Sequence, residues 1–240
     1  MLNNKKELTV IVLAINETFS LEKVIADVSL FSFVAKILIV SPEFVTKDCL
    51  KTQNKISENN ILVETIIQPL EYPGYGGAIK FSLKYIKTKY FCWLDGDGET
   101  NPAYLNKMYK VAQENKELNI INASRFKNND IIIKDYGLLQ SILTFLFQIF
   151  CKIFFGGIVT DYTVAYRIYK TKYFEKFTFE SNDQNFALET ILLPLLHKET
   201  KISEIYYEWT KRQEGASSNS ILNKFSYFKI FFNVLKKKIF

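Results

Sequence analysis

The chain has 240 residues, of which 48% are hydrophobic and 15% aromatic, so it can bury a substantial core and is not intrinsically disordered. Its formal net charge of +6 favours anionic partners such as phosphates or lipid headgroups, but it is too small to indicate nucleic acid binding. The three cysteines form neither a CxxC pair nor a cluster with the single histidine. This argues against a zinc site and a disulfide framework, and is typical of a reducing cytoplasm.

The first half of the chain alternates between short apolar runs and amphipathic segments. The runs are rich in β-branched residues and predict buried strands, while the segments between them predict helices. In chain order we expect strands at 8–15, 35–41, 61–67, 89–95 and 118–125, and helices at 20–31, 45–57, 74–87 and 102–115. This alternation predicts a doubly wound α/β fold with a mostly parallel sheet, whose right-handed connections bring the carboxyl ends of all strands to one edge.

The second half is less regular. Residues 137–155 predict a long apolar helix, and a polar stripe recurs along it at spacings of three and four: Ser141, Thr144, Gln148 and Lys152. We interpret it as an amphipathic helix that is buried or lies on a membrane, rather than one that spans it. Further along, extended structure is expected at 159–170 and 201–209, a helix at 183–197, and an aromatic, lysine-rich tail at 221–240.

Three acidic residues, Asp95, Asp97 and Glu99, alternate with glycines at the end of the strand predicted at 89–95. In an open parallel sheet, ligands bind at the carboxyl ends of the strands, where this cluster is expected to lie. In an extended segment the three carboxylates would share one side, and their mutual repulsion favours a neutralising cation. Hard oxygen ligands suit Mg²⁺ or Mn²⁺, which usually also hold substrate phosphates. The alternative is a solvated acidic turn, because Asp-Gly pairs often form turns.

Five segments of the chain, taken in order, are more specific than the acidic cluster alone. They are VIVLAINET, GYGGAIKFSLKYIKTKYFCWLDGDGE, NASRF, TDYTVAYRIYKTKYFEKF and FALETILLPLLHKETKISEIYYEWTKRQEGASS. This set, which spans residues 8 to about 218, resembles the family 2 glycosyltransferases of the GT-A fold. The pattern is most similar to the polyprenyl-phosphate (dolichyl-phosphate) mannose and glucose synthases.

The resemblance implies a GT-A, half-Rossmann-like domain at 1–218, with a nucleotide-sugar half at about 1–125 and an acceptor half at about 126–218. A basic, amphipathic helical appendage would follow at 219–240. The implied activity is that of an inverting, metal-dependent transferase. It would move a sugar from a nucleotide-diphosphate donor to a lipid-linked (polyprenyl phosphate) or envelope-glycan acceptor, with Mg²⁺ or Mn²⁺ as cofactor.

The resemblance also implies roles for single residues. The metal would be held by Asp95, Asp97 and Glu99, and the candidate catalytic residues are Asp97, Glu189 and Asp161. Of these, Glu189 would be the base if the acceptor is a sugar hydroxyl. Contacts to the nucleotide-sugar are expected from Ala14, Asn16, Glu17, Glu43, Gly76, Gly77, Asp95 and Gly96. Phosphate or acceptor contacts are expected from Arg125, Arg212 and Ser217.

The chain departs from the family pattern in three places. The second strand ends in Ser41-Pro42-Glu43 instead of an aspartate-rich turn, Val164-Ala165 stands where the family has Ser-Gly, and Ser218 stands where it often has a lysine. These departures leave the donor base and the acceptor open. They also leave open a catalytically degenerate GT-A protein that binds without turnover. A nucleotidyltransferase, which shares the α/β core and the same type of acidic metal site, is the other alternative.

The tail at 221–240 carries five lysines, no acidic residue and several aromatic residues. This composition predicts a cytoplasmic protein attached peripherally to the anionic inner face of a membrane. In the alternative interpretation, the tail and the helix at 137–155 pack on the domain and the lysines are simply solvated.

Overall fold

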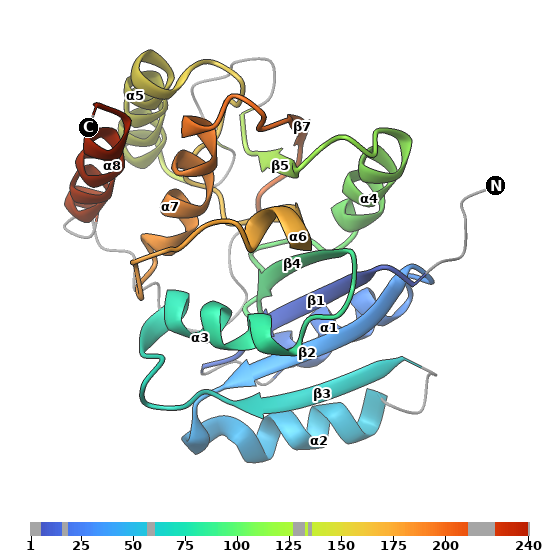
Figure 1. Ribbon diagram of the computed structural model, residues 1–240. Coiled ribbons are helices and arrows are strands. Elements are labelled where there is room, and N and C mark those ends of the chain that lie inside the picture. Colours follow the sequence, from blue (N-terminus) through green and yellow to red (C-terminus); the bar gives the residue numbers. More distant parts are fainter. Residues whose placement is uncertain are drawn as a thin grey trace.

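A seven-stranded mixed sheet forms the centre of the described part of the chain, in the order β3-β2-β1-β4-β6-β5-β7 (Figure 1). The computed structural model describes residues 6–15, 19–56, 61–126, 133, 136–210 and 224–239. The strands are β1 (Leu8–Leu13), β2 (Val34–Ser41), β3 (Leu62–Ile67), β4 (Tyr90–Asp95), β5 (Ile120–Ser124), β6 (Arg167–Lys170) and β7 (Ile202–Tyr206). The mostly parallel α/β fold predicted from the sequence is confirmed.

Helices cover both faces of the sheet, which explains why its central strands are continuous apolar runs. Val10 and Val12 of β1 face one core, whereas Ile11 and Leu13 face the other. The first core is closed by α1 (Phe19–Ser29), α2 (Thr46–Ile56) and α4 (Tyr104–Glu114). The second is closed by α3 (Gly74–Ser82), α5 (Leu138–Phe155), α7 (Phe186–Leu192) and α8 (Lys224–Ile239). Short helical turns complete the described chain: η1 (Glu43–Val45), η3 (Leu83–Tyr85), α6 (Thr171–Phe174) and η4 (Pro194–Leu196).

Strand β6 breaks the parallel pattern. It pairs antiparallel with both β4 and β5, and it covers only the last four residues of the extended segment predicted at 159–170. The expectation that every strand ends at the same edge was therefore wrong for β6. Because β6 runs the other way, the residues that precede it lie at the edge where β4 and β5 end. This reversal brings Asp161 and Thr163 to the same side of the sheet as Asp95.

Helices α5 and α8 lie side by side at one end of the molecule (Figure 1). The ring centroids of Phe150 and Phe231 are 4.5 Å apart, and Phe231 is fully buried. The described part of the basic tail therefore packs on the domain through one face. Within the described ranges, α5 is the one helix long and apolar enough to cross a membrane, and only 33% of it is buried.

Candidate active site

The acidic segment turns immediately after β4. The N–H of Gly96 donates to the carbonyl of Leu13 at 2.9 Å, which extends the pairing of β4 with β1 by one residue. The chain then folds back, because Asp97 Oδ1 accepts the N–H of Glu99 at 2.9 Å and Gly98 has a φ of +79°. Only glycine adopts such a φ readily. The expectation of an extended segment with three carboxylates on one side was wrong.

The turn separates Glu99 from the two aspartates. Burial raises the pKa of Tyr75 on α3, and the charges of Asp95 and Asp97 raise it further. Burial likewise raises the pKa of Tyr207 after β7, and there Glu99 is among the charges that add to the effect. Among the described residues, no three His, Cys, Asp or Glu side chains lie close enough to share a metal ion. In this geometry Glu99 does not form such a group with Asp95 and Asp97, which we take as the candidate ligands, and the role predicted for Glu99 is left to substitution.

Tyr75 joins the site although sequence reasoning did not single it out. Its hydroxyl accepts a hydrogen bond from Trp93 Nε1 at 3.0 Å and is hydrogen-bonded to Asp95. This chain of two hydrogen bonds fixes the carboxylate of Asp95 at the end of β4. The available signal was an aromatic residue inside the glycine-rich GYGG segment, in the first turn of the helix α3.

The glycines of that segment serve the packing of the chain itself. The N–H groups of Gly76 and Gly77 both donate to the carbonyl of Asn182, at 2.8 and 3.2 Å. A Cβ atom on Gly76 would lie 2.7 Å from the carbonyl oxygen of Ser181 and 2.7 Å from Cβ of Phe186. Gly76 thus permits the close approach of residues 181–186, whereas Gly77 permits that of the Tyr72 backbone, which a Cβ on Gly77 would meet. The N–H groups of Gly76 and Gly77 are thus used within the protein, and a contact of these glycines with the donor stays a prediction.

Glu189 on α7 fixes the same neighbouring segment. The side chain is buried, and its two oxygens accept the N–H groups of Glu180 at 2.9 Å and of Ser181 at 2.8 Å. It thereby holds residues 180–182 against the start of α3. In this geometry Glu189 positions residues 180–182, which pack beside the start of α3, the helix that carries Tyr75.

Arg125 and Asp161 form a buried ion pair. Arg125 Nε lies 2.7 Å from Asp161 Oδ2, and Nη2 lies 2.9 Å from Oδ1 and 2.7 Å from Thr163 Oγ1. The Asp161 side chain is fully buried and that of Arg125 is 9% exposed. Burial alone would raise the pKa of Asp161, but the charge of Arg125 and its hydrogen bonds outweigh burial and hold that pKa below its usual value.

The position of Asp161 differs from that expected of a catalytic acid or base. Its oxygens accept hydrogen bonds from Arg125, Thr163 and the N–H of Val164. The geometry makes it the residue that orients Arg125. Arg125 is therefore buried and held in place by Asp161, and its predicted contact with a phosphate group stays a prediction.

A second buried network supports this pair and was missed in the sequence. Arg167 is fully buried and donates to Asn122 Oδ1 at 2.6 Å. Asn122 Nδ2 in turn donates to the carbonyl of Asp161 at 2.9 Å and to Glu204 Oε2 at 2.7 Å. Burial raises the pKa of Glu204, against the hydrogen bonds from Thr160 that lower it. Arg167 closes the segment TDYTVAYR, so its place in that motif was the available signal.

Helix α5 contributes a side chain and a pocket to this half of the site. Gln148 Oε1 accepts the N–H of Tyr162 at 2.7 Å, and its Nε2 donates to Thr163 Oγ1 at 3.1 Å. Beside it lies a small, largely apolar pocket of about 190 Å³. Phe126, the residue that follows Arg125, forms part of its lining. The pocket is lined by Phe126, Phe145, Gln148, Ile149, Lys152 and Thr160.

The remaining predicted residues are placed as follows. Ala14 continues the pairing of β1 with β2, with its N–H donating to the Val40 carbonyl at 3.0 Å and its side chain in the core. Glu43 is exposed at the start of η1, directly after the carboxyl end of β2. Asn16, Glu17, Arg212 and Ser217 lie outside the described residues. Thr210 Oγ1 donates to the carbonyl of Gly98 at 3.1 Å, which joins the segment after β7 to the acidic turn.

Comparison with known protein families identifies the family of the chain. Residues 9–178, more than half of the chain, match the model of glycosyl transferase family 2. The chain belongs to glycosyl transferase family 2. The match runs from β1 through the acidic turn and the Arg125–Asp161 pair to β6. The prediction of a glycosyltransferase is confirmed at this level, and the alternative of a nucleotidyltransferase is not supported.

Solved structures agree on the fold. The chain is similar to glucosyl-3-phosphoglycerate synthase from Mycobacterium tuberculosis in complex with Mn²⁺, UDP and glucosyl-3-phosphoglycerate, with a TM-score of 0.70, 12% identity, and 96% of this chain and 80% of that chain covered. Two further complexes of the same enzyme were also found. The complex with Mn²⁺, UDP-glucose and glycerol 3-phosphate has a TM-score of 0.68 at 12% identity, covering 96% and 80% of the two chains. The complex with Mg²⁺ and UDP has a TM-score of 0.66 at 11% identity, with the same coverage. A comparison with curated proteins finds no match.

Proposed function

We propose that this family 2 chain is a metal-dependent, inverting glycosyltransferase that moves a sugar from a nucleotide diphosphate to a polyprenyl phosphate. The observation that carries the proposal is the pair Asp95 and Asp97 at the carboxyl edge of β4, with Asp95 fixed by Tyr75. Similar structures bind UDP together with Mn²⁺ or Mg²⁺, which supports the same kind of donor and cofactor here.

The donor set fits Mg²⁺ or Mn²⁺. Such ions are commonly held by one or two carboxylates, with substrate phosphates and water completing the shell. Asp95 and Asp97 supply two carboxylates on one turn, and the hydrogen bond from Tyr75 restrains the first of them. When bound, the ion would neutralise charge on the leaving diphosphate. Further donor contacts are proposed from Ala14, Asn16, Glu17, Glu43 and Gly96.

In the reaction, an oxygen of the acceptor forms a bond to C1 of the sugar while the bond from C1 to the diphosphate breaks. The bonding electrons leave with the nucleoside diphosphate. Attack from the face opposite the leaving group inverts the configuration at C1. The role of the chain is to hold donor and acceptor in line, which lowers the barrier without any covalent intermediate.

The surroundings of the two candidate bases favour a phosphate acceptor. Each oxygen of Glu189 and of Asp161 accepts a hydrogen bond from the protein. A sugar hydroxyl must lose a proton to a base as it attacks, whereas a phosphate oxygen is already anionic. Arg125, together with Arg212 and Ser217, would bind that phosphate. The largely apolar pocket beside Arg125 would accept the first part of a lipid chain.

An envelope-glycan acceptor is the second candidate, with Glu189 as the base. It requires Glu189 to exchange one backbone hydrogen bond for a hydrogen bond to the acceptor hydroxyl.

We place the enzyme at the cytoplasmic face of a membrane, where both a nucleotide-sugar and a lipid phosphate are accessible.

Transfer of a radiolabelled sugar tests the proposal. Wild-type protein is incubated with Mn²⁺, a panel of UDP- and GDP-sugars, and either a polyprenyl phosphate or the matched polyprenol. We expect labelled lipid only with the phosphate, and its loss on adding EDTA or in Asp95→Asn. Transfer to the polyprenol or to a glycan would contradict the phosphate acceptor. Nucleotide binding without turnover on any acceptor would instead favour the degenerate binding protein.

A further inference from the structure

Helix α5 buries polar side chains beside the apolar Phe147, Cys151 and Phe155, and its exposed face is apolar. Its polar side chains Ser141, Thr144 and Gln148 are buried against the domain. The side chains that it exposes are apolar: Leu138, Leu139, Ile142, Leu143, Leu146, Ile149, Ile153 and Phe154. Leu146 is 56% and Ile153 is 71% exposed. A contiguous apolar stripe of this length on a surface marks a binding face rather than scattered exposure.

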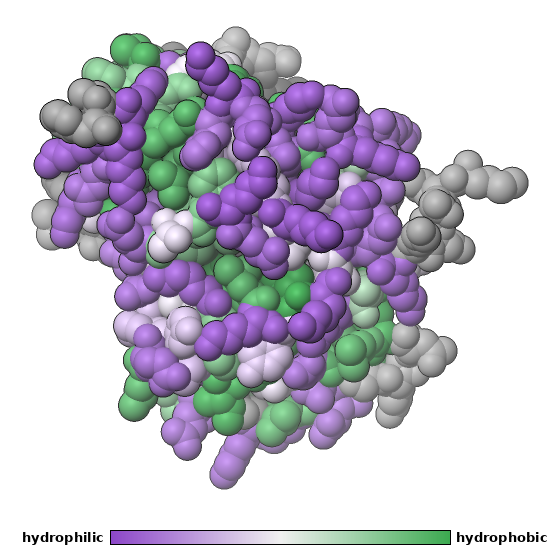
Figure 2. All heavy atoms as spheres, viewed as in Figure 1, coloured by the Kyte–Doolittle hydropathy of each residue, from purple (hydrophilic) through white to green (hydrophobic). Residues whose placement is uncertain are grey.

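Helix α8 extends this face. Its Phe228 and Phe232 are exposed, and both rings contact Phe150 of α5, with centroids 5.8 and 6.4 Å apart. Both helices run in the same direction, because Phe147 contacts Phe228 while Lys238 near the end of α8 donates to the carbonyl of Phe154. Figure 2 shows apolar residues gathered at the upper left of the molecule, where Figure 1 places α5. The two helices thus present one continuous surface, which we call the α5–α8 surface.

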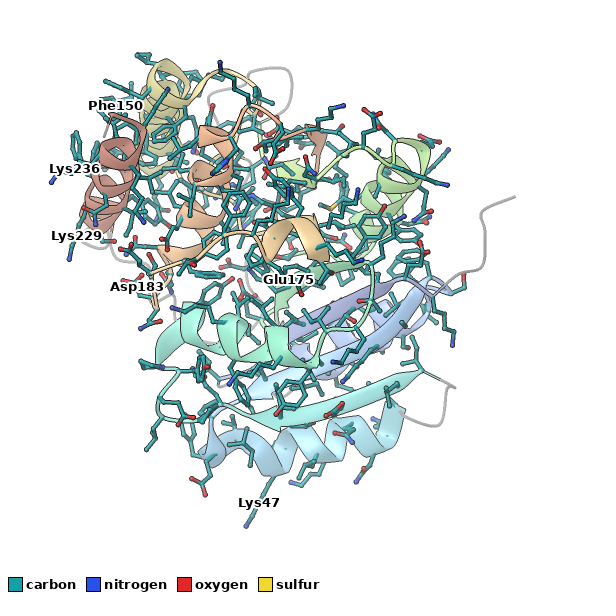
Figure 3. All side chains as sticks on the ribbon, in the orientation of Figure 1. Lys47, Phe150, Glu175, Asp183, Lys229 and Lys236 are labelled. Carbon is teal, nitrogen blue, oxygen red and sulfur yellow. The ribbon has the colours of Figure 1, made fainter. Side chains whose placement is uncertain are left out.

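Positive charge borders the α5–α8 surface. Lys229, Lys236, Lys237 and Lys238 are all exposed on α8, and the described part of that helix contains no acidic residue. Figure 3 shows Phe150 between the two helices, with Lys229 and Lys236 on the outer side of α8. Lys237 is paired with Glu180 at 2.7 Å, so Lys229 and Lys236 are the better candidates for an external partner.

We propose that the α5–α8 surface docks on the anionic leaflet of a lipid bilayer, with α5 lying in the interface. The apolar stripe would enter the boundary between headgroups and acyl chains, and the α8 lysines would contact anionic headgroups. Charge favours an anionic bilayer over a second copy of the chain, because the described part of α8 carries lysines and no acidic side chain that could pair with the lysines of another copy.

The packing of α5 decides against a membrane span. Gln148 is hydrogen-bonded to the N–H of Tyr162 and to Thr163, and Ser141 Oγ accepts the N–H of Ile133 at 3.1 Å. A spanning α5 would break these bonds and expose Gln148 to lipid. An interfacial α5 keeps them and buries only its apolar stripe.

Docking in this orientation also aligns the acceptor side of the site with the lipid. Ile149 belongs both to the exposed stripe and to the wall of the pocket, and Lys152 lines the same pocket. A lipid phosphate in the leaflet would therefore meet the pocket without leaving the interface. This last step rests on the proposed function, whereas the docking itself does not.

Co-sedimentation of the full chain with vesicles tests the docking, without any nucleotide or metal. Vesicles contain phosphatidylcholine alone or phosphatidylcholine with 30% phosphatidylglycerol. We expect binding to the anionic vesicles that weakens with salt. Leu146→Glu/Ile153→Glu should weaken it by about tenfold or more, because two apolar side chains lose their burial in the interface. Lys229→Glu/Lys236→Glu should weaken it by at least about 25-fold, because each lysine lost accounts for about fivefold and the new carboxylates add repulsion.

Matched controls lie away from the surface. Leu30→Glu changes a leucine that is 80% exposed, and Lys47→Glu changes a lysine at the opposite end of the molecule (Figure 3). Both should bind like the wild type. Unchanged binding of folded Leu146→Glu/Ile153→Glu, or no binding of the wild type to anionic vesicles, would overturn the docking. A stable dimer that this variant dissociates would also overturn it. Nucleotide-dependent thermal stabilisation of the same variant reports separately on the proposed function.

Discussion

Replacing Asp161 with asparagine should destabilise the protein strongly, because it leaves the charge of Arg125 buried without its partner. The pair is held by contacts of 2.7 and 2.9 Å, and neither side chain is more than 9% exposed. Breaking a buried ion pair by removing one partner costs about 3–5 kcal/mol. For a chain of this size, each kcal/mol lowers the melting temperature by about 2–4 °C, so a decrease of roughly 6–20 °C is expected.

The control is Glu199→Gln, which breaks the exposed pair of Lys176 and Glu199. Their separation is 3.4 Å, and the side chains are 56% and 65% exposed. Exposed pairs contribute about 0–1 kcal/mol, so this variant should melt close to the wild type. Differential scanning calorimetry at pH 7 compares the three proteins. Equal melting temperatures for Asp161→Asn and Glu199→Gln would refute the reasoning.

The same pair predicts a pH dependence. The pKa of Asp161 is lowered in the folded state. The contribution of the ionised side chain to the free energy of unfolding is therefore fully present above the pKa of the unfolded state, about 3.9. It is lost as the pH falls through the lower, folded-state pKa. The difference in melting temperature between wild type and Asp161→Asn should therefore be constant from pH 7 to about 5, and should shrink in stronger acid. A difference that grows in acid would contradict the assignment.

Two further substitutions test the wall of the donor site. Gly76→Ala should destabilise by about 1–3 kcal/mol, because its Cβ would lie 2.7 Å from Cβ of Phe186, whereas Gly157→Ala, with nothing within 4 Å, should be neutral. Equal melting curves for the two variants would contradict the packing. Tyr75→Phe should weaken Mn²⁺ binding in the presence of nucleotide by about tenfold, since it removes the hydrogen bond that orients Asp95. Calorimetric titration with Mn²⁺ measures this, and an unchanged affinity would argue against the positioning role.

The parallel half of the fold could be predicted from the sequence because its signals are local. The apolar runs of β1, β2 and β4 are largely buried, so periodicity and length identified them within a few residues. The reversal at β6 could not be predicted in the same way. Its direction depends on pairing with β4 and β5, which are distant in sequence, and the segment before it is irregular although its composition suits a strand.

The sequence predicted which residues belong to the site better than it predicted how those residues are arranged. Asp95 and Asp97 were placed at the sheet edge by the end of β4 alone. The departure of Glu99 depends on a single glycine with positive φ, and the ion pair of Arg125 depends on the reversed strand. Both are consequences of backbone direction, which residue type and spacing do not determine.

The exposed face of α5 shows a further limit of sequence patterns. The polar stripe was recognised, but a pattern of polar and apolar faces does not say which face the domain buries. Here Gln148 bonds to the loop before β6, and Phe147, Cys151 and Phe155 enter the core on the same side, so the remaining apolar side chains face outward. That choice depends on the tertiary partner of the polar face.

The central claim is that Asp95 and Asp97 hold a metal on a nucleotide diphosphate, and thermal stability against nucleotides tests it most directly. Wild-type protein, Asp97→Asn and Glu99→Gln are each melted with UDP, GDP and their common sugars, with and without Mn²⁺. The account predicts stabilisation by one nucleotide only with Mn²⁺, its loss in Asp97→Asn, and its retention in Glu99→Gln, which leaves both aspartates in place. Stabilisation that needs no metal, or equal loss in both variants, would contradict it.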